Sequence, residues 1–505
     1  MTREYREKML SDPYRPGYHF AFPDGNGNPG DPNGAFYADG RYHLMYLYYR
    51  SNTDSYNWGH ISSLDLLHWR HHPDALGSYN NDRGCNSGGG FVDDDGTAYI
   101  SFWKFPAKDH NPDKGGLAIA YSKPPYDTWK RIEPIAYEGA HEWGVADIII
   151  NGETEHISCA DPSNIWKQNG YYYMLAGNYH VLHWYGRKED SPEKYKGDWT
   201  DLFKSKDMKK WEFVHRFYKN NHTDSDYPDE TEDNMCPCFF PLPDKKSGGK
   251  LTDKYILLFI SHNKGCQYYI GSLKNEIFYP EKHGRMTWKD KSYGPPEMLM
   301  DDKNRCITWS WLCDNYSEDE FEKFGWSGVF SFPRILWYED GYLHMSPAHE
   351  LDKLEYNCQE FIIGHLNTEK NLNIKNGNSF RLKTEIDITS ATKTGFKIKI
   401  NSDDKDDYTE IYFMKNEIVF KNNKHNASTM GAEEIAPFTL NKDEKLSVDL
   451  FVDKSVVEIY INERQAICRR VYSKFPEKSL GVSVFSDGAA FDKITVSEIM
   501  PTNPY

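Results

Sequence analysis

The stretch DPNGAFYADG, Asp31 to Gly40, recurs as DPSNIWKQNG, Asp161 to Gly170, with the same layout and no gap. Each copy opens on Asp-Pro, continues with apolar or aromatic residues and closes on an Asp-Gly or Asn-Gly pair. Two apolar runs joined by such a pair are the strongest short-range signal for a β-hairpin. The sequence therefore predicts one kind of hairpin at two distant places in the chain.

Three further segments follow this layout, each with an apolar strand after its turn. They are SGGGFVDDDG (Ser87 to Gly96), CPCFFPLPDK (from Cys236) and FPRILWYEDG (Phe332 to Gly341). Repeated hairpins with further strands between them indicate a five-bladed β-propeller, with an irregular β-sandwich as the alternative. Because the heads of the innermost strands of a propeller converge on its axis, we expect Asp31 and Asp161 to face one funnel.

The composition and pattern of the chain change after about residue 360. Trp is absent from there on, and short segments of alternating polarity such as KLSVDLFVD and SVVEIYIN follow one another. This pattern is typical of a β-sandwich. A chain of 505 residues can fill two cores. We therefore predict an all-β protein with a propeller over 1–355, a linker over 356–371 and a C-terminal β-sandwich over 372–505.

The composition of the chain excludes several classes of function and partner. A net charge of -16 argues against nucleic acid as a partner, because no basic surplus is present to neutralise phosphates. The start, MTREYREKML, is charged where a signal peptide is apolar, and no segment is long and apolar enough to span a membrane. The nine cysteines lack metal-ligand spacing. We expect a cytoplasmic protein without a membrane partner, a metal or another cofactor.

Two carboxylates in one axial funnel suit the cleavage of a glycosidic bond. One carboxylate attacks or stabilises an oxocarbenium-like centre, while a partner of raised pKa protonates the leaving oxygen. The abundant aromatic residues, 15% of the chain, fit both sheet packing and the stacking of sugar rings. A small saccharide is therefore the expected partner.

At this point the chain resembles glycoside hydrolase family 32, the group of invertases, levanases and inulinases. The matching segments are DPNG, NWGHISSLDLLHW, NSGGGF, CADPSNIW, MCPCFFPL, GWSGVFSFPRIL and SPAHEL, in the order of that family's motifs. FVDKSVVEIYIN and GVSVFS resemble its sandwich module. The resemblance covers roughly residues 17 to 496 and implies retaining transfer of a furanosyl group.

The resemblance also implies roles for individual residues. Asp31 corresponds to the nucleophile, and Asp161 corresponds to a carboxylate that stabilises the transition state by holding sugar hydroxyls. The implied lining of the first sugar subsite consists of Trp58, Asn86 and Ser87, with Trp309 or Trp311 as a wall.

Three departures remove hydrogen-bonding side chains of the family. Gly30 replaces an Asn, Leu47 replaces a Gln and Ala160 replaces an Arg. Losing such groups commonly costs orders of magnitude in discrimination between substrates. The first subsite is therefore expected to differ from that of an ordinary invertase.

A fourth departure concerns the proton donor, because Met235 stands where the family has its acid/base Glu. Glu230, Glu232 and Asp233 lie just upstream, within an acidic run that also reads as a solvated loop. By strand parity Asp233 shares a face with Met235, whereas Glu232 needs a bulge to point the same way. We predict Glu232 as the acid, since its side chain is longer, with Asp233 as the alternative.

The leading hypothesis is a glycosidase that cleaves, or transfers, a terminal β-fructofuranosyl unit of sucrose-like or fructan oligosaccharides. Hydrolysis and transfer share one covalent intermediate. One alternative keeps the mechanism on another furanoside or a difructose anhydride. A second alternative is a carbohydrate-binding protein without catalysis. The sandwich is expected to support the propeller, and a homo-oligomer contact through it is a further expectation.

Overall fold

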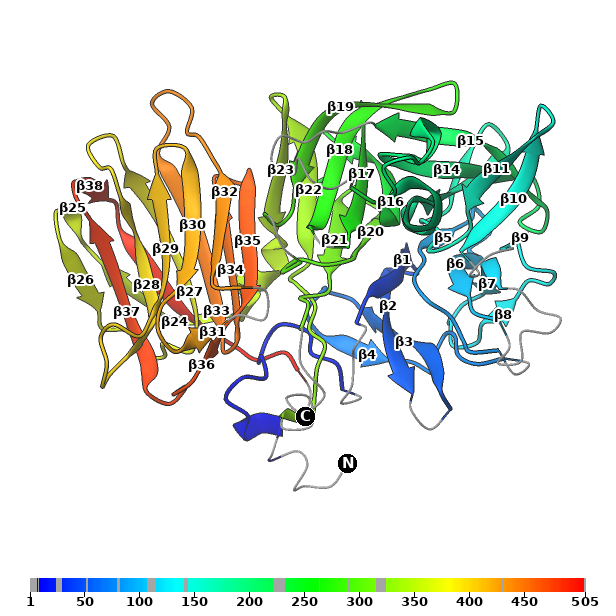
Figure 1. The fold of residues 1–505 in the computed structure, drawn as a ribbon. Coiled ribbons are helices and arrows are strands. Elements are labelled where there is room, and N and C mark those ends of the chain that lie inside the picture. Colours follow the sequence, from blue (N-terminus) through cyan, green and yellow to red (C-terminus); the bar gives the residue numbers. More distant parts are fainter. Residues whose placement is uncertain are drawn as a thin grey trace.

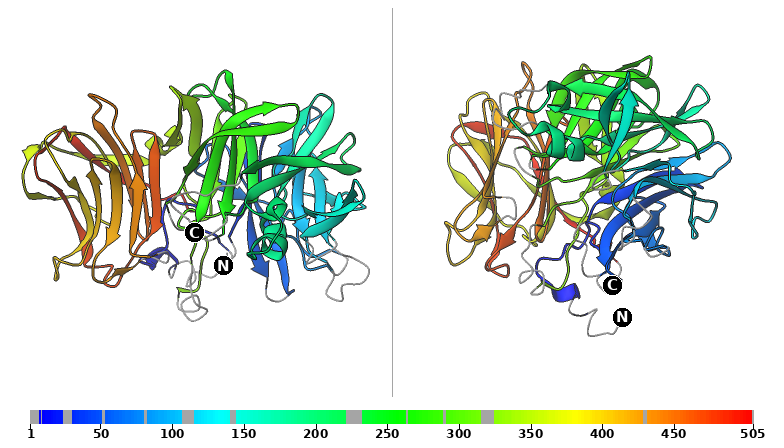
Figure 2. Two further views of the ribbon diagram at one scale, coloured as in Figure 1. Left: turned by 45° about the horizontal axis from the view of Figure 1, so that its top comes forward. Right: turned by 45° about the vertical axis from the view of Figure 1, so that its right-hand side comes forward.

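A computed structural model describes residues 7, 9–23, 30–50, 53–79, 82–106, 115–139, 144–220, 232–262, 264–288, 291–314, 324–427 and 431–503. The chain forms a five-bladed β-propeller followed by a β-sandwich that lies beside it (Figure 1). Figure 2 shows the two bodies flanking one another from two further directions. The predicted fold class is confirmed.

Each blade is an antiparallel four-stranded sheet whose strands follow chain order. Blade 1 contains β1 (Pro32–Ala38), β2 (Arg41–Arg50), β3 (Ser55–Ser63) and β4 (Trp69–His71), and blade 2 contains β5 (Gly90–Val92), β6 (Ala98–Lys104), β7 (Gly116–Ser122) and β8 (Lys130–Arg131). Blade 3 contains β12 (Trp166–Gln168), β13 (Tyr171–Gly177), β14 (Asp198–Ser205) and β15 (Trp211–Asn220), and blade 4 contains β16 (Met235–Pro243), β17 (Leu251–Ser261), β18 (Gly265–Lys274) and β19 (Ile277–Arg285). Blade 5 contains β20 (Pro296–Met300), β21 (Cys306–Ser310), β22 (Arg334–Glu339) and β23 (Tyr342–Pro347). β9 (Tyr137–Glu138) pairs with β7, and β10 (Val145–Ile150) with β11 (Glu153–Ser158) forms a separate hairpin.

Hydrogen bonds join the first three blades near the axis. The backbone N–H of Gly34 donates to the carbonyl of Gly88 at 3.2 Å, which links blade 1 to blade 2. The hydroxyl of Ser101 donates to the carbonyl of Ser163 at 2.6 Å, which links blade 2 to blade 3. These contacts satisfy polar groups that a propeller core would otherwise bury unpaired.

The remaining blades are joined in the same way. The Asn164 amide donates to the carbonyl of Phe239 at 3.1 Å and accepts from its N–H at 2.8 Å, so blades 3 and 4 share a two-point bridge. The thiol of Cys238 donates to the carbonyl of Pro296 at 3.7 Å, between blades 4 and 5.

Glu297 on β20 connects the last blade to the first. Its Oε1 accepts the N–H of Ala35 at 2.9 Å. Burial raises the pKa of Glu297 well above its usual value, although hydrogen bonds from Ala35 and Gly90 lower it. With this contact every blade has a hydrogen-bonded neighbour on both sides.

The fifth repeat differs from the expectation. The hairpin over Phe332–Gly341 forms β22 and β23, the two outer strands of blade 5, whereas β20 and β21 are the inner pair. The Asp340-Gly341 turn has the same local chemistry as the other turns, and a local hairpin signal does not report distance from the axis. Four of the five predicted hairpins are the inner pairs of their blades.

The sandwich consists of two larger sheets and a short pair. One sheet contains β24 (Glu355–Phe361), β39 (Ile494–Ile499), β27 (Ser379–Asp387), β33 (Leu446–Asp453), β34 (Val456–Ile461), β35 (Gln465–Arg470), β25 (Gly364–Leu366) and β38 (Ala489–Phe491). The other contains β26 (Glu369–Leu372), β37 (Ser479–Ser486), β28 (Thr394–Asn401), β29 (Thr409–Met414), β30 (Glu417–Asn422) and β32 (Glu433–Pro437), and β31 (Asn426–Ala427) pairs with β36 (Tyr472–Ser473). The segment 356–371, predicted as a linker, therefore consists largely of sandwich strands that pair with β39, β38 and β37.

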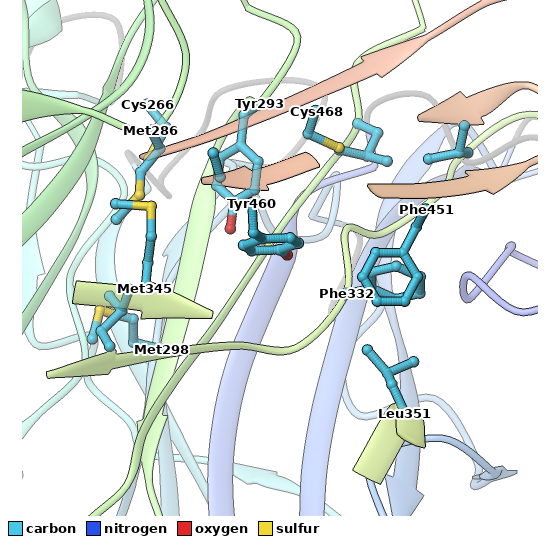
Figure 3. Packing of buried hydrophobic residues seen from close by; sticks show 14 of the residues in the cluster. Cys266, Met286, Tyr293, Met298, Phe332, Met345, Leu351, Phe451, Tyr460 and Cys468 are labelled. Atoms are coloured by element: carbon cyan, nitrogen blue, oxygen red, sulfur yellow. The ribbon is translucent and has the colours of Figure 1, made fainter. Parts of the chain in front are cut away.

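An apolar cluster runs from blades 4 and 5 into the sandwich (Figure 3). Phe332 of the propeller meets Phe451 of β33 with ring centroids 4.8 Å apart. Beside it, His19 contacts Asp453 through Nδ1 at 3.0 Å and Glu458 through Nε2 at 3.3 Å. The two bodies thus share one core that includes buried charges.

Helical segments are few and short in the described residues. Besides the helical residues 9–11, they include α2 (Tyr179–Val181), η1 (Leu182–Gly186), η2 (Glu193–Tyr195) and η3 (His349–Leu354). None of the helices that the structure describes has the length and apolar character needed to cross a membrane. The α2–η1 segment matters for the site, because it follows β13 at the end of blade 3 where Asp161 lies.

Candidate active site

Asp31 lies immediately before β1, at the axial end of blade 1. Its carbonyl accepts the N–H of Leu47 at 2.9 Å and the side-chain amide of Asn33 at 2.9 Å, which fixes the backbone. The hydroxyl of Ser87, before β5, donates to Asp31 Oδ2 at 2.6 Å. Burial raises the pKa of Asp31 to about 6, while the Ser87 hydrogen bond and the charge of His262 lower it.

Asp161 occupies the corresponding place in blade 3. Its φ of 38° lies in the left-handed region, where a non-glycine residue is strained, and such strain clusters at functional sites. Its Oδ1 is buried without a hydrogen-bond partner. Burial, followed by the charge of Asp31, raises the pKa of Asp161 to about 8. The charge of Asp31 therefore acts on the Asp161 carboxyl.

Cys236 completes this group from blade 4. Its thiol donates to Asp161 Oδ2 at 3.7 Å. Its φ of 48° accompanies a bulge in the pairing of β16 with β17 between Met235 and Cys238. Burial and the charges of Asp161 and Asp31 raise the pKa of Cys236 well above its usual value, so the thiol stays neutral. It can donate a hydrogen bond here but is a poor nucleophile.

His262, directly after β17, is a residue that the sequence did not single out. Its Nδ1 lies 2.7 Å from Asp233 Oδ2, and its backbone N–H donates to Asp233 Oδ1 at 2.9 Å. The ring stacks on Tyr179 of α2 with centroids 3.9 Å apart. The His262 side chain is 43% exposed. A polar residue after a strand that ends at the funnel, in SHNKG, was the available signal.

The predicted acids are engaged elsewhere. Glu232 is fully buried and pairs with Arg285 at 2.5 Å and with Lys264 at 3.5 Å. Asp233 is held by His262. Glu230 lies outside the described residues. The bulge begins after Met235 and so leaves Glu232 directed at the Arg285 side of the blade.

The predicted subsite residues divide into two groups. Ser87 is in the site through its bond to Asp31, and half-buried Asn86 precedes it. Trp58 is 0% exposed and Trp309 is 1% exposed, so both belong to apolar clusters and cannot stack on a sugar. Trp311 is half-buried beside Phe330. Motif matching had not separated core tryptophans from exposed ones.

A second apolar cluster lies next to Asp161. It contains Trp103, Phe105, Ala160, Met235, Cys236 and Ile260, with Tyr56 and Tyr179 packed against it. Trp103 meets the ring of His180 edge-on at 4.9 Å. This cluster occupies the place where the sequence comparison with the family predicts charged and polar groups.

Three histidines of blade 1, namely His43, His60 and His72, also come together, with ring nitrogens within 4.8 Å of one another. His43 Nδ1 lies 2.9 Å from His60 Nε2, and His72 bonds to Asp127 at 2.6 Å. The His60 and His72 rings are stacked at 4.2 Å with an interplanar angle of 20°, so their lone pairs do not converge on a common point. The group therefore consists of a His43–His60 hydrogen bond and a separate His72–Asp127 contact, joined by ring stacking.

Comparison with known proteins agrees with this architecture. The model of the glycosyl hydrolases family 32 N-terminal domain matches residues 19–347, and that of the family 32 C terminal domain matches residues 350–498. Sucrose-6-phosphate hydrolase of Zymomonas mobilis is 24% identical over 94% of this chain and 89% of its own. Levanbiose-producing levanase of Bacillus subtilis is 24% identical over 96% and 90%.

Solved structures show the same fold. Fructan 1-exohydrolase IIa from Cichorium intybus superposes with a TM-score of 0.78 at 18% identity, covering 97% of this chain and 98% of its own. Sucrose-6-phosphate hydrolase from Lactobacillus gasseri gives a TM-score of 0.76 at 19% identity, covering 99% and 96%. With both family models matched in order along the chain, this protein belongs to glycosyl hydrolase family 32.

Proposed function

We propose that the protein is a retaining glycosidase that releases a terminal β-fructofuranosyl unit, with Asp31 as the nucleophile. The observation that carries this proposal is the placement of Asp31 and Asp161 at the heads of two blades, where the charge of Asp31 acts on Asp161. At neutral pH a pKa of about 6 leaves Asp31 ionised, whereas a pKa of about 8 keeps Asp161 protonated. Two carboxylates with separated pKa values are the usual basis for distinct roles.

The contacts support a division of labour between the two oxygens of Asp31. Ser87 holds Oδ2, and Oδ1 accepts no hydrogen bond from the described residues, so Oδ1 is the oxygen available to attack the anomeric carbon. Asp161 Oδ1, buried without a partner, is placed to hold a sugar hydroxyl. Water then attacks the same carbon and restores the Asp31 carboxylate.

The proposed substrates are sucrose-like and fructan oligosaccharides. The relatives include a sucrose-6-phosphate hydrolase and a levanase, and one solved neighbour is a fructan 1-exohydrolase bound to 1-kestose. Transfer to a second sugar uses the same fructosyl-enzyme and is part of the proposal.

A second candidate substrate class follows from the apolar cluster beside Asp161. Ala160 and Met235 belong to this cluster, at positions where the family has a charged residue, and neither offers the sugar a charge. A furanoside with fewer free hydroxyls near the anomeric centre, such as a difructose anhydride, fits this surrounding better. The mechanism at Asp31 is unchanged.

The test is the release of sugar from sucrose, inulin- and levan-type oligosaccharides and difructose anhydrides, with Asp31→Asn as the control. We expect release by the wild-type protein and loss in the variant by at least about 10⁴-fold, as removal of a nucleophile gives in other hydrolases. Release that persists in Asp31→Asn would reject the proposed nucleophile. Silence on all fructosides, with sugar bound in calorimetry, would favour a binding protein.

The proposed setting is a reducing compartment such as the cytoplasm. All nine cysteines are free, and eight of them are buried. Unpaired buried thiols are typical of proteins that fold under reducing conditions. Such a location favours small imported saccharides over long polymers. The homo-oligomer expected from the sequence stays a prediction, which light scattering after size-exclusion chromatography tests.

A further inference from the structure

The mechanism of a retaining glycosidase needs a group that protonates the leaving oxygen. Met235, at the family position of that group, is 2% exposed and packs with Trp103, Phe105 and Ile260. A thioether has no proton to give. Glu232, the predicted substitute, is held in a buried ion pair with Arg285.

The topology of blade 4 brings another group to this place. β16 and β17 are antiparallel, and Met235 at the start of β16 pairs with Ile260 near the end of β17. His262 follows two residues later, so it lies at the axial end of the blade. Cys236, one residue after Met235, already touches Asp161 at this end.

The bonds of His262 leave one nitrogen free. Nδ1 is held by Asp233 Oδ2 at 2.7 Å, and the backbone N–H binds the other oxygen of the same carboxylate. Tyr179 stacks on the ring and fixes its plane. Nε2 has no hydrogen bond to any residue that the structure describes. A carboxylate that orients imidazole and stabilises its charged form is a common support for a catalytic histidine.

The acidic groups around His262 favour its protonated form. Burial lowers the pKa of His262, but the charge and hydrogen bond of Asp233, followed by the charges of Asp161 and Asp31, raise it above its usual value. In return, the His262 charge lowers the pKa of Asp31 and of Asp161. His262 is therefore close enough to the proposed nucleophile to act on it electrostatically.

Basic side chains also lie on the elements next to His262. His180 of α2 feels the charges of His262 and His183, and burial lowers its pKa to about 4, so it is neutral at pH 7. The guanidinium of Arg187 lies 5.8 Å from the ring centroid of Tyr179, the residue that stacks on His262. On the turn of His262 itself, Lys264 pairs with Glu232. Asp233, Asp161 and Asp31 therefore set the direction in which the pKa of His262 shifts.

We propose that His262, oriented by Asp233, is the catalytic acid and base that replaces the missing glutamate; this inference rests on the proposed fructosidase function. As Asp31 Oδ1 bonds to the anomeric carbon, the glycosidic C–O bond breaks and its electron pair stays on the leaving oxygen. That oxygen takes the proton of His262 Nε2, which leaves neutral imidazole. In the second half, Nε2 takes a proton from the attacking water, and the bond to Asp31 breaks with its electron pair returning to the carboxylate.

The experiment compares two substrates in His262→Gln. Sucrose needs a protonated leaving group, whereas p-nitrophenyl β-fructofuranoside has a leaving group that departs without one. We expect kcat/KM on sucrose to fall by about 10²–10⁴-fold, the usual contribution of a general acid. On the aryl fructoside kcat/KM is expected to fall less than about 10-fold, and azide is expected to accelerate turnover by attacking the fructosyl-enzyme without a base.

The matched control is His156→Gln. His156 also binds an aspartate through Nδ1, Asp147 at 2.7 Å, and also stacks on a tyrosine, Tyr185 at 3.7 Å. It lies on β11 and is not among the groups whose charge acts on Asp31 or Asp161. Its substitution is expected to leave both substrates unaffected. Asp233→Asn is expected to reproduce the substrate difference of His262→Gln more weakly.

Three outcomes would overturn the proposal. Unchanged sucrose activity in His262→Gln would exclude the residue and leave protonated Asp161 as the donor. Equal losses on both substrates without azide rescue would assign His262 a structural role. If the wild-type protein cleaves neither substrate, the proposed function itself fails, and the assignment of His262 fails with it.

Discussion

Asp31 and Asp161 have different protonation states at neutral pH because their immediate surroundings differ. Both are buried, but Asp31 has the short hydrogen bond from Ser87, which stabilises its ionised form. Asp161 Oδ1 has no partner, and the charge of Asp31 acts on it in addition. Burial without compensation favours the neutral acid.

This difference predicts the pH dependence of activity. Ionised Asp31 is needed as the nucleophile, so kcat/KM is expected to fall as the pH drops through about 6. Protonated His262 is needed as the acid, so kcat/KM is also expected to fall as the pH rises through its raised pKa. A profile on sucrose and on the aryl fructoside checks this. The alkaline limb is expected on sucrose and is expected to flatten on the aryl substrate; an identical limb on both would contradict the account.

The raised pKa of Asp161 also predicts that this residue lowers the stability of the fold at high pH. The pKa of an aspartate side chain is ordinarily 3.8, the value expected in the unfolded chain, whereas that of Asp161 in the folded protein is about 8. The protonated side chain therefore contributes stability that is complete below about pH 4 and lost as the pH rises through 8. The neutral amide in Asp161→Asn cannot ionise, so this loss of stability does not occur in the variant. We expect its fold to be more stable than wild type at pH 9 by about 1–3 kcal/mol.

Thermal unfolding between pH 5 and pH 9 measures this effect. The difference in Tm between Asp161→Asn and wild type is expected to grow with pH. The exposed Asp190→Asn serves as control and is expected to give a difference that does not change. A difference that shrinks with rising pH would show that Asp161 is ionised at little cost.

The two aspartates could be predicted from the sequence more completely than the side chains around them. Asp31, Asp161 and Ser87 could be placed because the repeat and the motifs lie at strand heads, where geometry is shared between blades. Trp58 and Trp309 could not be distinguished from exposed tryptophans, because burial depends on neighbouring blades. His262 was missed because its role depends on the alignment of β16 with β17 and on α2, which no local pattern records.

The inner strands are fixed to their neighbours by a small number of polar bridges. Asn164, 1% exposed, makes two hydrogen bonds to Phe239 and thereby joins blade 3 to blade 4. Substitution by Ala leaves one buried N–H and one buried carbonyl without partners, at about 1–3 kcal/mol each. We predict that Asn164→Ala lowers the free energy of unfolding by about 2–5 kcal/mol.

Urea unfolding measures the effect, with the exposed Gln168→Ala in β12 as a control that is expected to change little. A loss below about 0.5 kcal/mol in Asn164→Ala would mean that water replaces the amide and that the bridge does not hold the blades together.

Elements were predictable from sequence where one local signal decides them. Asp-Gly and Asn-Gly turns located the hairpins, but the rank of a hairpin within its blade follows from the whole sheet, so Phe332–Gly341 was assigned to the wrong layer. Residues 356–371 are predicted as a linker because the composition of the chain changes there. Their strands β24, β25 and β26 are held by long-range pairing with strands near the end of the chain.

At the scale of the molecule, Asp453 connects the N-terminal segment to the sandwich. Its carboxylate accepts the N–H groups of Gly17, Tyr18 and His19 and contacts the His19 ring. Although burial raises the pKa of Asp453, its contacts with His19 outweigh burial and lower it. This contribution to stability is present above about pH 4 and is lost as the pH falls through the lowered pKa.

Breaking one partner of a buried pair typically costs about 3–5 kcal/mol. We therefore predict a large loss of stability in Asp453→Asn at pH 7, measured by thermal unfolding. Asp406→Asn, at an exposed position of the sandwich, is the control and is expected to change the free energy of unfolding by less than about 1 kcal/mol. Equal effects in both variants would contradict a specific role for the buried contact.

A retaining mechanism requires that Asp31 form a covalent fructosyl-enzyme. Rapid acid quenching of the protein during turnover of p-nitrophenyl β-fructofuranoside, followed by mass spectrometry of its peptides, detects this intermediate. Use of His262→Gln is expected to increase the trapped fraction, because the second half-reaction then lacks its base. The account predicts one added hexosyl unit on the peptide that contains Asp31, and none in Asp31→Asn. Turnover with the hexosyl unit on another residue, or with no adduct in His262→Gln, would contradict it.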